Sequence, residues 1–453
     1  VFHRVIDGFM AQTGDVQYGK AGADTSRAGM GGSDKPDLKA EFSEVPYDRG
    51  IVGMARSSNP DSANSQFFIM FAPGHFLNGK YTVVGKVTDG MDVVDAMRDD
   101  WSRDPFVLIE EDGYFFGRGT GDNKLGMTAV VTAFLRLKSE GWVPGRDLII
   151  AFSGDEETGM ITTKALVNEY RYLTDSEFVL NADSGGARIP EDGGIPSSYS
   201  MQAAEKTYVT WEITARNSGG HSSRPRKDNA IYDLADAITK IQNYQFPVNY
   251  NDLTLAFFEA TGKKTNGQLG IAMRAFSKNP KNKNAINTLR SFGYVGSLGT
   301  TCVATMLRAG HAENALPQSA TATVNCRIFP GTGVENTLKK LKQVIDNPSI
   351  EFLMLGIPTE TDPSPLREDI TMALQQAIDI KYPGLEIIPS MSSGGTDGMH
   401  FRAAGIPSYG VNGGYGKASD SFAHGLNERI LVQTFYDNLA HWYILLQAIA
   451  SSN

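Results

Sequence analysis

The chain has 453 residues, more than one ordinary hydrophobic core can organise, and its length predicts about three domains. Hydrophobic residues make up 41% and charged residues 21% of the chain, which is the composition of a folded globular protein and excludes disorder as the default. The formal net charge of -9 and the lack of any run of Lys and Arg exclude a surface built to neutralise nucleic-acid phosphates.

The first part of the chain, residues 1 to about 97, has an all-β pattern. Short strand-like runs such as FFIMF and YTVVGKV alternate with loops rich in Gly, Asp, Ser and Pro. From Trp101 onward strands alternate with longer helical patterns: DLIIAFS, a helix near residues 161–170, and then FVLNAD. This alternation predicts a mostly parallel α/β sheet covered by helices.

A compact α+β insert is predicted to begin near Met201. Its pattern gives a strand at TYVTWEITARN, an amphipathic helix at DNAIYDLADAITKIQNY, a strand at TATVNCRIF and a helix at ENTLKKLKQVIDN. After about Pro363 helical runs return at PLREDITMALQQAIDIKYPG and ERILVQTFYDNLAHWYILLQAIA, with IPSYGVNGG as a strand between them. The expected organisation is therefore a β domain followed by a discontinuous α/β domain with the insert as its lid, at residues 1–97, 98–200, 201–355 and 356–453.

Few features of the sequence bear on the cellular compartment. The two cysteines, Cys302 and Cys326, exclude a disulfide framework but leave one bridge and two buried thiols equally open. The first residues, VFHRVIDGFM, show no signal peptide, and the apolar segment at Trp442 to Ala450 is shorter than the roughly 20 residues of a membrane helix. We expect a soluble protein with no membrane partner, in the cytoplasm or the periplasm.

Three blocks in the first part, FHRVIDGFMAQTGD, GMARSSNPDSANSQFFIMF and HFLNGKYTVVGKV, resemble the cyclophilin family of peptidyl-prolyl isomerases, in that order. The resemblance implies that Arg4 is the catalytic arginine, which would stabilise the twisted X-Pro amide without any cofactor. It also implies a pocket for proline-containing peptides formed by Phe9, Met10, Gln12, Ala55, Gln66, Phe68, Phe76, Leu77 and Tyr81. Tyr81 stands where many members have His, as in some bacterial ones. Cyclophilins are closed eight-stranded barrels, whereas this segment lacks the family's first and last strands, so we expect a partial barrel with unpaired edges.

A second set of blocks, from Trp101 to the end, resembles the acetylornithine deacetylase, aminoacylase and dipeptidase family of zinc metallopeptidases. The blocks are WSRDPFVLIEEDGYFFGRGTGDNKLG, IIAFSGDEETG, NADSGG, NSGGHSSRP, ENALPQSATATVNCRIFPG, SSGGTDGMHF and SFAHGLNE. Two acidic motifs follow apolar runs, so Asp155, Glu156, Glu157 and Asp183 should gather at the carboxyl ends of neighbouring parallel strands. Clustered carboxylates with an imidazole suit Zn²⁺.

The resemblance also implies roles for individual residues around the metal. Asp122 would bridge two zinc ions, Glu157 and His424 would complete one site, and Asp183 would belong to the other. Glu156 matches the general base that takes a proton from the bridging water. The peptide bond between Asp122 and Asn123 is expected to be cis, as it is in this family.

Further matches lie in the predicted lid and at the rim of the site. His221 matches the lid histidine that, in dimeric members, reaches a partner's active site to stabilise the oxyanion, so a homodimer through the lid is a further expectation. Asn314 and Arg327 match contacts to the substrate carboxylate or backbone. The rim near the substrate terminus is matched by Gly394, Gly395 and Thr396.

The two resemblances meet in the string DGMDVVDA. In the zinc family the corresponding motif is G-H-x-D-V-V, in which the His binds metal and the Asp orients that His. Asp92 is in register with this Asp, whereas Gly90 stands where the His should be. The same string also ends a cyclophilin strand, which indicates a chimera joined within a shared motif. We therefore expect at most one tightly bound zinc.

Together the motifs predict a metal-dependent hydrolase of amide bonds in small peptides or N-acyl amino acids, fused to a truncated cyclophilin-like segment. The missing His predicts that the hydrolase is weakly active or inactive. Two other classes stay open. One is a prolyl isomerase or proline-peptide-binding module with an inactive hydrolase, and the other is a non-catalytic fusion or an assembly artefact.

Overall fold

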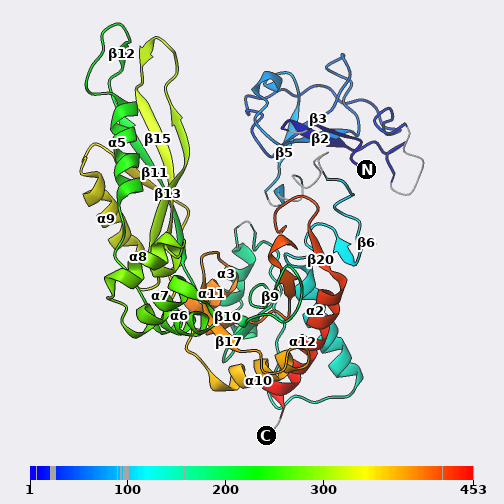
Figure 1. The fold of residues 1–453 in the computed structure, drawn as a ribbon. Coiled ribbons are helices and arrows are strands. Elements are labelled where there is room, and N and C mark those ends of the chain that lie inside the picture. Colours follow the sequence, from blue (N-terminus) through cyan, green and yellow to red (C-terminus); the bar gives the residue numbers. More distant parts are fainter. Residues whose placement is uncertain are drawn as a thin grey trace. The chain divides into compact units, whose positions relative to one another are not determined.

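The structure is a computed structural model of the chain, and it describes residues 1–6, 8–20, 27–88, 90, 91, 94, 101–157, 159–420 and 422–451 (Figure 1). Its contacts divide the chain into two compact units, each of which is described here by itself. The first unit contains Val1–Met127, Glu157–Gly159 and Gly416–Tyr436. The second contains Thr128–Glu156, Met160–Tyr415 and Asp437–Asn453.

A five-stranded antiparallel sheet forms the beginning of the first unit. Its strands are β1 (Arg4–Ile6), β2 (Met10–Thr13), β3 (Ile51–Met54), β4 (Phe67–Met70) and β5 (Val83–Lys86), with the short 3-10 helix η1 (His75–Leu77) before β5. The strand order is β1-β2-β4-β3-β5, so β1 and β5 are edges and the sheet is open, as the partial barrel requires. Its alternating side chains meet in a core around Met10, Tyr47, Phe68, Met70 and Leu77.

A mixed four-stranded sheet organises the second unit. Its order is β17-β10-β18-β8, from Ile387–Ser392, Tyr199–Glu205, Ser408–Gly410 and Val179–Asn181. The β10–β17 and β18–β8 pairs are parallel, whereas β10 and β18 are antiparallel. The main helices that contribute to its core are α2 (Lys124–Ser139), α10 (Glu368–Asp379) and α12 (Val432–Ala450).

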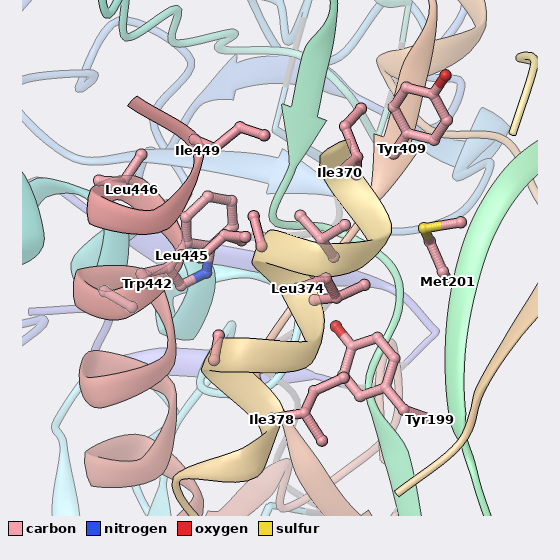
Figure 2. Packing of buried hydrophobic residues seen from close by; sticks show 14 of the residues in the cluster. Tyr199, Met201, Ile370, Leu374, Ile378, Tyr409, Trp442, Leu445, Leu446 and Ile449 are labelled. Carbon is pink, nitrogen blue, oxygen red and sulfur yellow. The ribbon is translucent and has the colours of Figure 1, made fainter. Parts of the chain in front are cut away.

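Figure 2 shows how two of these helices meet the sheet. Leu374 of α10 and Leu445 of α12 are fully buried, and they lie in one cluster with Tyr199 and Met201 of β10 and Tyr409 of β18. The last two predicted helical runs therefore form helices whose apolar side chains lie in the core. Burial of such side chains stabilises the fold by roughly 1.5–3 kcal/mol each.

The predicted insert, called the lid below, contains a second four-stranded sheet, with the order β13-β15-β11-β16. The strands are Thr301–Ala309, Ser319–Ile328, Thr207–Arg216 and Glu351–Leu355, all paired antiparallel. Every second residue of β11, including Val209, Trp211 and Ile213, packs against α5 (Ala230–Asn243) and α9 (Val334–Ile345), which Figure 1 shows along these strands. The predicted strands and helices of the insert are confirmed.

Three helices were not predicted from the sequence: α6 (Asp252–Lys264), which contacts β17 of the mixed sheet, α7 (Gly267–Lys278) and α8 (Lys283–Ser291). They form a separate small core around Phe258, Met273, Phe276 and Leu289. The basic stretch NPKNKN lies between α7 and α8 and runs into the start of α8. The remaining elements are α3 (Ile161–Asn168), α4 (Arg171–Thr174), α11 (Gly398–Ala403), η2 (Gly296–Leu298), η3 (Ala418–Asp420), β6 (Ile109–Glu111), β7 (Tyr114–Phe116), β9 (Ala187–Ile189), β12 (Gly220–His221), β14 (Ala315–Leu316), β19 (Tyr415–Lys417) and β20 (Arg429–Leu431).

One predicted strand is wrong. The run DLIIAFS forms no strand, and its Ile149 and Phe152 are half-exposed. A strand needs a backbone partner on at least one side, and β8, at the end of its sheet, has β18 as its one neighbour among the described strands. Among the described strands, this run therefore has no neighbour with which to form the backbone hydrogen bonds of a sheet.

The two cysteines lie opposite each other on β13 and β15 and form the Cys302–Cys326 disulfide, which selects one of the two alternatives left open by the sequence. The bridge joins neighbouring strands of the lid sheet, beneath α5. Among the described helices, none combines the length and the apolar character needed to cross a membrane.

Candidate metal centre

Antiparallel strands β6, β7 and β20 bring two distant loops of the first unit together. Phe116, the last residue of β7, pairs with Arg429, the first residue of β20. The loop after β7 carries Asp122, and the loop before β20 carries His424, so this pairing places residues some 300 positions apart in sequence beside each other. The motifs GRGTGD and SFAHGLNE are the two loops of one site.

Glu428 fixes the loop that carries Asp122. Its side chain is 1% exposed, and its carboxylate accepts hydrogen bonds from the backbone N–H groups of Gly119, Gly121 and Asp122 at 2.8, 2.8 and 2.9 Å. Arg118 pairs with the same carboxylate at 3.0 Å. Buried carboxylates are stable when they are paired and hydrogen-bonded in this way, and such bonds hold a loop in one conformation. This supporting role of Glu428 was not predicted, although the residue ends the motif SFAHGLNE.

Asp122, Glu157 and His424 form the cluster that could hold a metal ion. One ligand atom from each lies within 4.8 Å of the other two. His424 Nε2 is 3.1 Å from Asp122 Oδ2 and 3.0 Å from Glu157 Oε1. Ligand atoms that bind Zn²⁺ tetrahedrally at 2.0–2.2 Å lie about 3.3 Å apart, so this spacing and the donor set of two carboxylates and one imidazole fit zinc.

The electrostatics of the cluster agree with a cation site. Partial burial alone would lower the pKa of His424, but the charges and hydrogen bonds of Glu157 and Asp122 outweigh it and raise that pKa. The two carboxylates thus attract positive charge at the position of the imidazole. The peptide bond between Asp122 and Asn123 is cis, as the resemblance implies.

Asp155 and Glu157, in the acidic run after DLIIAFS, have different contacts. Asp155 accepts hydrogen bonds from the backbone N–H groups of Ile161 and Thr162, the first two residues of α3. Burial would raise the pKa of Asp155, but these bonds and the Thr162 hydroxyl lower it. Asp155 therefore holds the start of a helix, whereas Glu157 lies in the metal cluster. The gathering of all four acidic residues at one edge of the sheet remains a prediction.

Glu156 and Asp183 belong to the second unit, where each is half-buried. Asp183 follows β8, and its backbone N–H donates to the side chain of Asn181 at 2.8 Å. This is the carboxyl end of a sheet strand, as predicted for Asp183. The metal and base roles of these two residues remain predictions.

The lid residues form two groups. His221 on β12 pairs with Ala315 of β14, and the carbonyl of Asn314 accepts from Ser222 at 3.0 Å, so His221 and Asn314 lie on adjacent backbone segments. The ring of His221 contacts the Ser223 hydroxyl through Nδ1 at 2.8 Å.

Arg327 belongs to the second group, at the rim. It donates to the carbonyl of Ser393 at 2.7 Å, beside exposed Gly394 and Gly395. Thr396, which follows them, is buried and donates to Glu205 at 2.6 Å. The structure thus brings Arg327 to the loop that was predicted to form the rim near the substrate terminus.

The predicted isomerase surface is also assembled on its own sheet. Arg4 of β1 is exposed and pairs with Gln12 of β2, whose side chain donates to Gln66 at 2.9 Å. The rings of Phe9 and Phe76 lie 5.4 Å apart, and those of Phe68 and Tyr81 meet edge to face at 5.8 Å. The other predicted pocket residues pack in the core of this sheet: Met10, Ala55 and Leu77.

Comparison with known proteins matches the two regions to two different families. The family model described as peptidase family M20/M25/M40 matches residues 90–448, about four fifths of the chain. The chain belongs to this family. The model for cyclophilin type peptidyl-prolyl cis-trans isomerases matches residues 1–109, so the first part of this M20 chain is a cyclophilin region.

The M20 region has remote curated relatives. The N-fatty-acyl-amino acid synthase/hydrolase of Homo sapiens is 27% identical over 379 residues, which cover 79% of this chain and 72% of that protein. A probable carboxypeptidase S-like protein of Dictyostelium discoideum is 25% identical over 79% of this chain and 70% of its own length.

The cyclophilin region has a nearer curated relative, a probable peptidyl-prolyl cis-trans isomerase of Brucella abortus. It is 68% identical over 99 residues, which cover 21% of this chain. The match spans about half of the length of that isomerase.

Solved structures show the same M20 fold. The metallo-carboxypeptidase of Sulfolobus solfataricus matches with a TM-score of 0.55 and 19% identity, covering 77% of this chain and 81% of that one. The di-peptidase Dug1p of Saccharomyces cerevisiae matches with a TM-score of 0.54 and 15% identity, over 78% and 76% of the two chains.

The two family models overlap at residues 90–109, directly over the shared string, which confirms the predicted chimera. Gly90, at the start of the overlap, has φ 81°, a left-handed conformation that favours glycine. The backbone at the position of the expected histidine therefore has a geometry in which a histidine would be strained. Asp92, predicted to orient that histidine, lies outside the described residues.

Proposed function

We propose that the M20 region is a zinc-dependent hydrolase of amide bonds in small peptides or N-acyl amino acids. The observation that carries this proposal is the Asp122–Glu157–His424 cluster, whose spacing and donor atoms fit one zinc ion. The names of the relatives support the substrate class, since they describe a hydrolase of acylated amino acids and a carboxypeptidase.

A bound zinc would supply Lewis-acid chemistry, by making a water more acidic and polarising the scissile carbonyl. Asp122, Glu157 and His424 would hold the ion, and Glu428 would keep Asp122 in place through its three backbone hydrogen bonds. The carboxylate of Glu156 would take a proton from the attacking water and then give it to the leaving amine.

Residues of the lid and rim would orient the substrate. Arg327, beside Ser393, would bind the negative end of the substrate, and Gly394, Gly395 and Thr396 would border its terminus. Asn314 would contact the substrate backbone, and His221 would stabilise the developing oxyanion. In dimeric members this histidine comes from the partner, so a homodimer through the lid is part of the proposal.

The second zinc site lacks its histidine at Gly90. Asp122 and Asp183 alone would bind a second ion weakly, because removal of even an outer-shell partner costs about 10- to 100-fold in affinity or activity. We therefore propose one tightly held zinc per chain and a hydrolase of reduced activity.

A hydrolysis assay with and without a chelator tests the proposal. Purified full-length protein, dialysed and then supplied with Zn²⁺, is incubated with a panel of dipeptides and N-acyl amino acids. Hydrolysis that a chelator abolishes and added Zn²⁺ restores is the expected result. Hydrolysis that persists in the chelator, or is absent with zinc bound, would contradict it. His424→Ala should lose metal and activity together, whereas the exposed lid residue His311→Ala should keep both.

Isomerase activity is the second candidate function, favoured by the assembled pocket around Phe68 and by Arg4 at its strand pair with Gln12. Proline isomerisation of a test peptide should be weak, insensitive to chelator and lost in Arg4→Ala. The open edges at β1 and β5 are the reason to expect weak activity, because an unclosed sheet holds the pocket less rigidly.

A further inference from the structure

A cavity of about 480 Å³ lies within the lid, between the end of α5, helix α8 and the start of β13. Its walls include Ile241 and Tyr244 at the end of α5, Arg290 of α8, Leu298 of η2 and Cys302 of β13. All of its lining residues belong to the second unit. Its volume is in the range of roughly 300–1,000 Å³ that is usual for small-molecule sites. No residue predicted to bind metal or substrate lines it.

Cys302 brings one end of the Cys302–Cys326 disulfide to this cavity. Successive side chains of a strand point to opposite faces of the sheet. Cys302 packs against the core beneath α5, the helix whose end lines the cavity, whereas its neighbour Val303 is 59% exposed on the other face. Cys302 is half-buried and Cys326 is fully buried. A small molecule in the cavity therefore meets the bridge at Cys302.

Arg290 makes the cavity electropositive. Among the residues that line the cavity, it alone carries a charge. Its guanidinium donates to the side chain of Gln245 at 3.0 Å and to the carbonyl of Phe246 at 3.3 Å, and among the described residues it forms no ion pair with a carboxylate. A half-buried cation whose partners are neutral oxygens attracts an anion. The rings of Tyr244 and Phe246, 4.9 Å apart, add an apolar wall, so the cavity suits a small anion with an apolar part.

We propose that the cavity is a thiol–disulfide exchange site, in which a small anionic thiol of the size of glutathione binds beside Arg290 and attacks Cys302. The thiolate sulfur forms a bond to Cys302 Sγ while the bond between Cys302 Sγ and Cys326 Sγ breaks. The bonding pair leaves on Cys326 Sγ, which takes a proton from water and stays buried as a neutral thiol. One disulfide replaces another, so the step needs no oxidant. Attack by Cys326 on the mixed disulfide restores the bridge.

The exchange changes the lid without dismantling its sheet. Strands β13 and β15 stay paired by the backbone bonds of their antiparallel register, while the covalent tie between them is replaced by an anionic group on Cys302. The site goes beyond the proposed hydrolase and does not depend on it, because neither the metal cluster nor the substrate residues take part.

Two single-cysteine variants test which sulfur the cavity serves. Cys326→Ala leaves Cys302 as the one thiol, and Cys302→Ala leaves Cys326. Each full-length variant is incubated with oxidised glutathione, which transfers one glutathionyl group to a protein thiolate and leaves as reduced glutathione, and intact-mass spectrometry follows the adduct. Cys302 should react at least about 10-fold faster than Cys326, because the reactivity of a thiol follows its access and its thiolate fraction.

Cystamine, which transfers a cationic group in place of the anionic glutathionyl group, tests the role of charge. In the Cys326→Ala background, Arg290→Gln should lower the ratio of the glutathione rate to the cystamine rate about 5-fold, the effect of one charge contact at about 4 Å near solvent. A change in the thiolate fraction of Cys302 affects both reagents equally and cancels in this ratio. Arg308→Gln removes an exposed arginine from the same strand, where it pairs with Glu212, and should leave the ratio unchanged.

The wild-type protein supplies a measurement that needs no variant. It is incubated with reduced glutathione, quenched with acid and digested, and the mixed disulfide should map to Cys302. A mixed disulfide on Cys326, or none at all, would overturn the exchange site. Equal rates for the two single-cysteine variants, or a rate ratio that Arg290→Gln does not change, would overturn it as well. If a variant does not fold, the wild-type map decides.

Discussion

At the scale of single residues, the candidate metal site depends on Glu428, whose side chain lies outside the ligand cluster. The Glu428 carboxylate accepts hydrogen bonds from three backbone N–H groups of the loop that carries Asp122, and it is itself paired with Arg118. A carboxylate with two oxygens can accept all these bonds, whereas an amide at this position offers one acceptor. The position of Asp122 is thus set by Glu428, the last residue of the motif SFAHGLNE.

The first prediction concerns this support. Glu428→Gln should lower zinc affinity about 10- to 100-fold, because Asp122 loses its fixed position while every ligand stays present. Competition with a fluorescent zinc chelator measures the affinity. Glu351→Gln, which removes an exposed ion pair with Arg216, serves as the matched control. Equal affinities for Glu428→Gln and wild type would show that the loop does not depend on this carboxylate.

At the scale of elements, the last helix carries a titratable group in its core face. His441 of α12 is fully buried, donates a hydrogen bond through Nε2 to the carbonyl of Val411 at 2.9 Å, and stacks on Tyr199. Burial lowers the pKa of His441 to about 4, against the opposing effect of the Val411 carbonyl. The helix is therefore docked on the sheet with a neutral imidazole.

The second prediction follows from this docking. Between pH 6.5 and about 4 the unfolded chain binds a proton at His441 and the folded chain does not, so stability falls as the pH falls through this range. The loss attributable to His441 should be about 3 kcal/mol. Urea unfolding at several pH values, followed by α-helical circular dichroism, measures it. His441→Gln should flatten the profile relative to wild type, and His311→Gln, in the exposed part of the lid, should not. Superimposable profiles for His441→Gln and wild type would refute the assignment.

At the scale of the whole molecule, the chain combines an open cyclophilin sheet with an M20 region. The mixed sheet has β8 as an edge, and the apolar run that follows α2 lies unpaired with Ile149 and Phe152 half-exposed. The two regions join at Gly90, at the position where the zinc family has the end of a strand and a metal-binding histidine. The described part of the M20 region thus keeps one assembled ligand cluster.

The third prediction concerns the number of metal ions. After dialysis against buffer without zinc, elemental analysis should return about one zinc per chain, because the proposed second site would have Asp122 and Asp183 alone as protein ligands. Gly90→His should leave this value near one, since φ 81° at this position disfavours a side chain. Two tightly held ions in the wild-type protein would contradict the proposal, and two in Gly90→His alone would show that the histidine was the sole missing part.

The sequence by itself determined the two parentages, most of the order of the elements and the three residues of the candidate metal cluster, Asp122, Glu157 and His424, because motifs and periodicity are local properties of the chain. The helices α6 to α8 were not predicted. Their apolar residues form a common core only when the three helices pack together. The sequence wrongly predicted a strand at DLIIAFS, because a strand depends on partners elsewhere in the chain.

Only the tertiary structure decided which acidic residues share a site. The run Asp155 to Glu157 reads as one acidic patch, but Asp155 turns to the start of α3 and Glu157 to His424. The role of Glu428 was likewise invisible in the sequence, where it is one charged residue among many. Its burial and its long-range partners give it significance, because a charge removed from water must be compensated by groups that the fold brings to it.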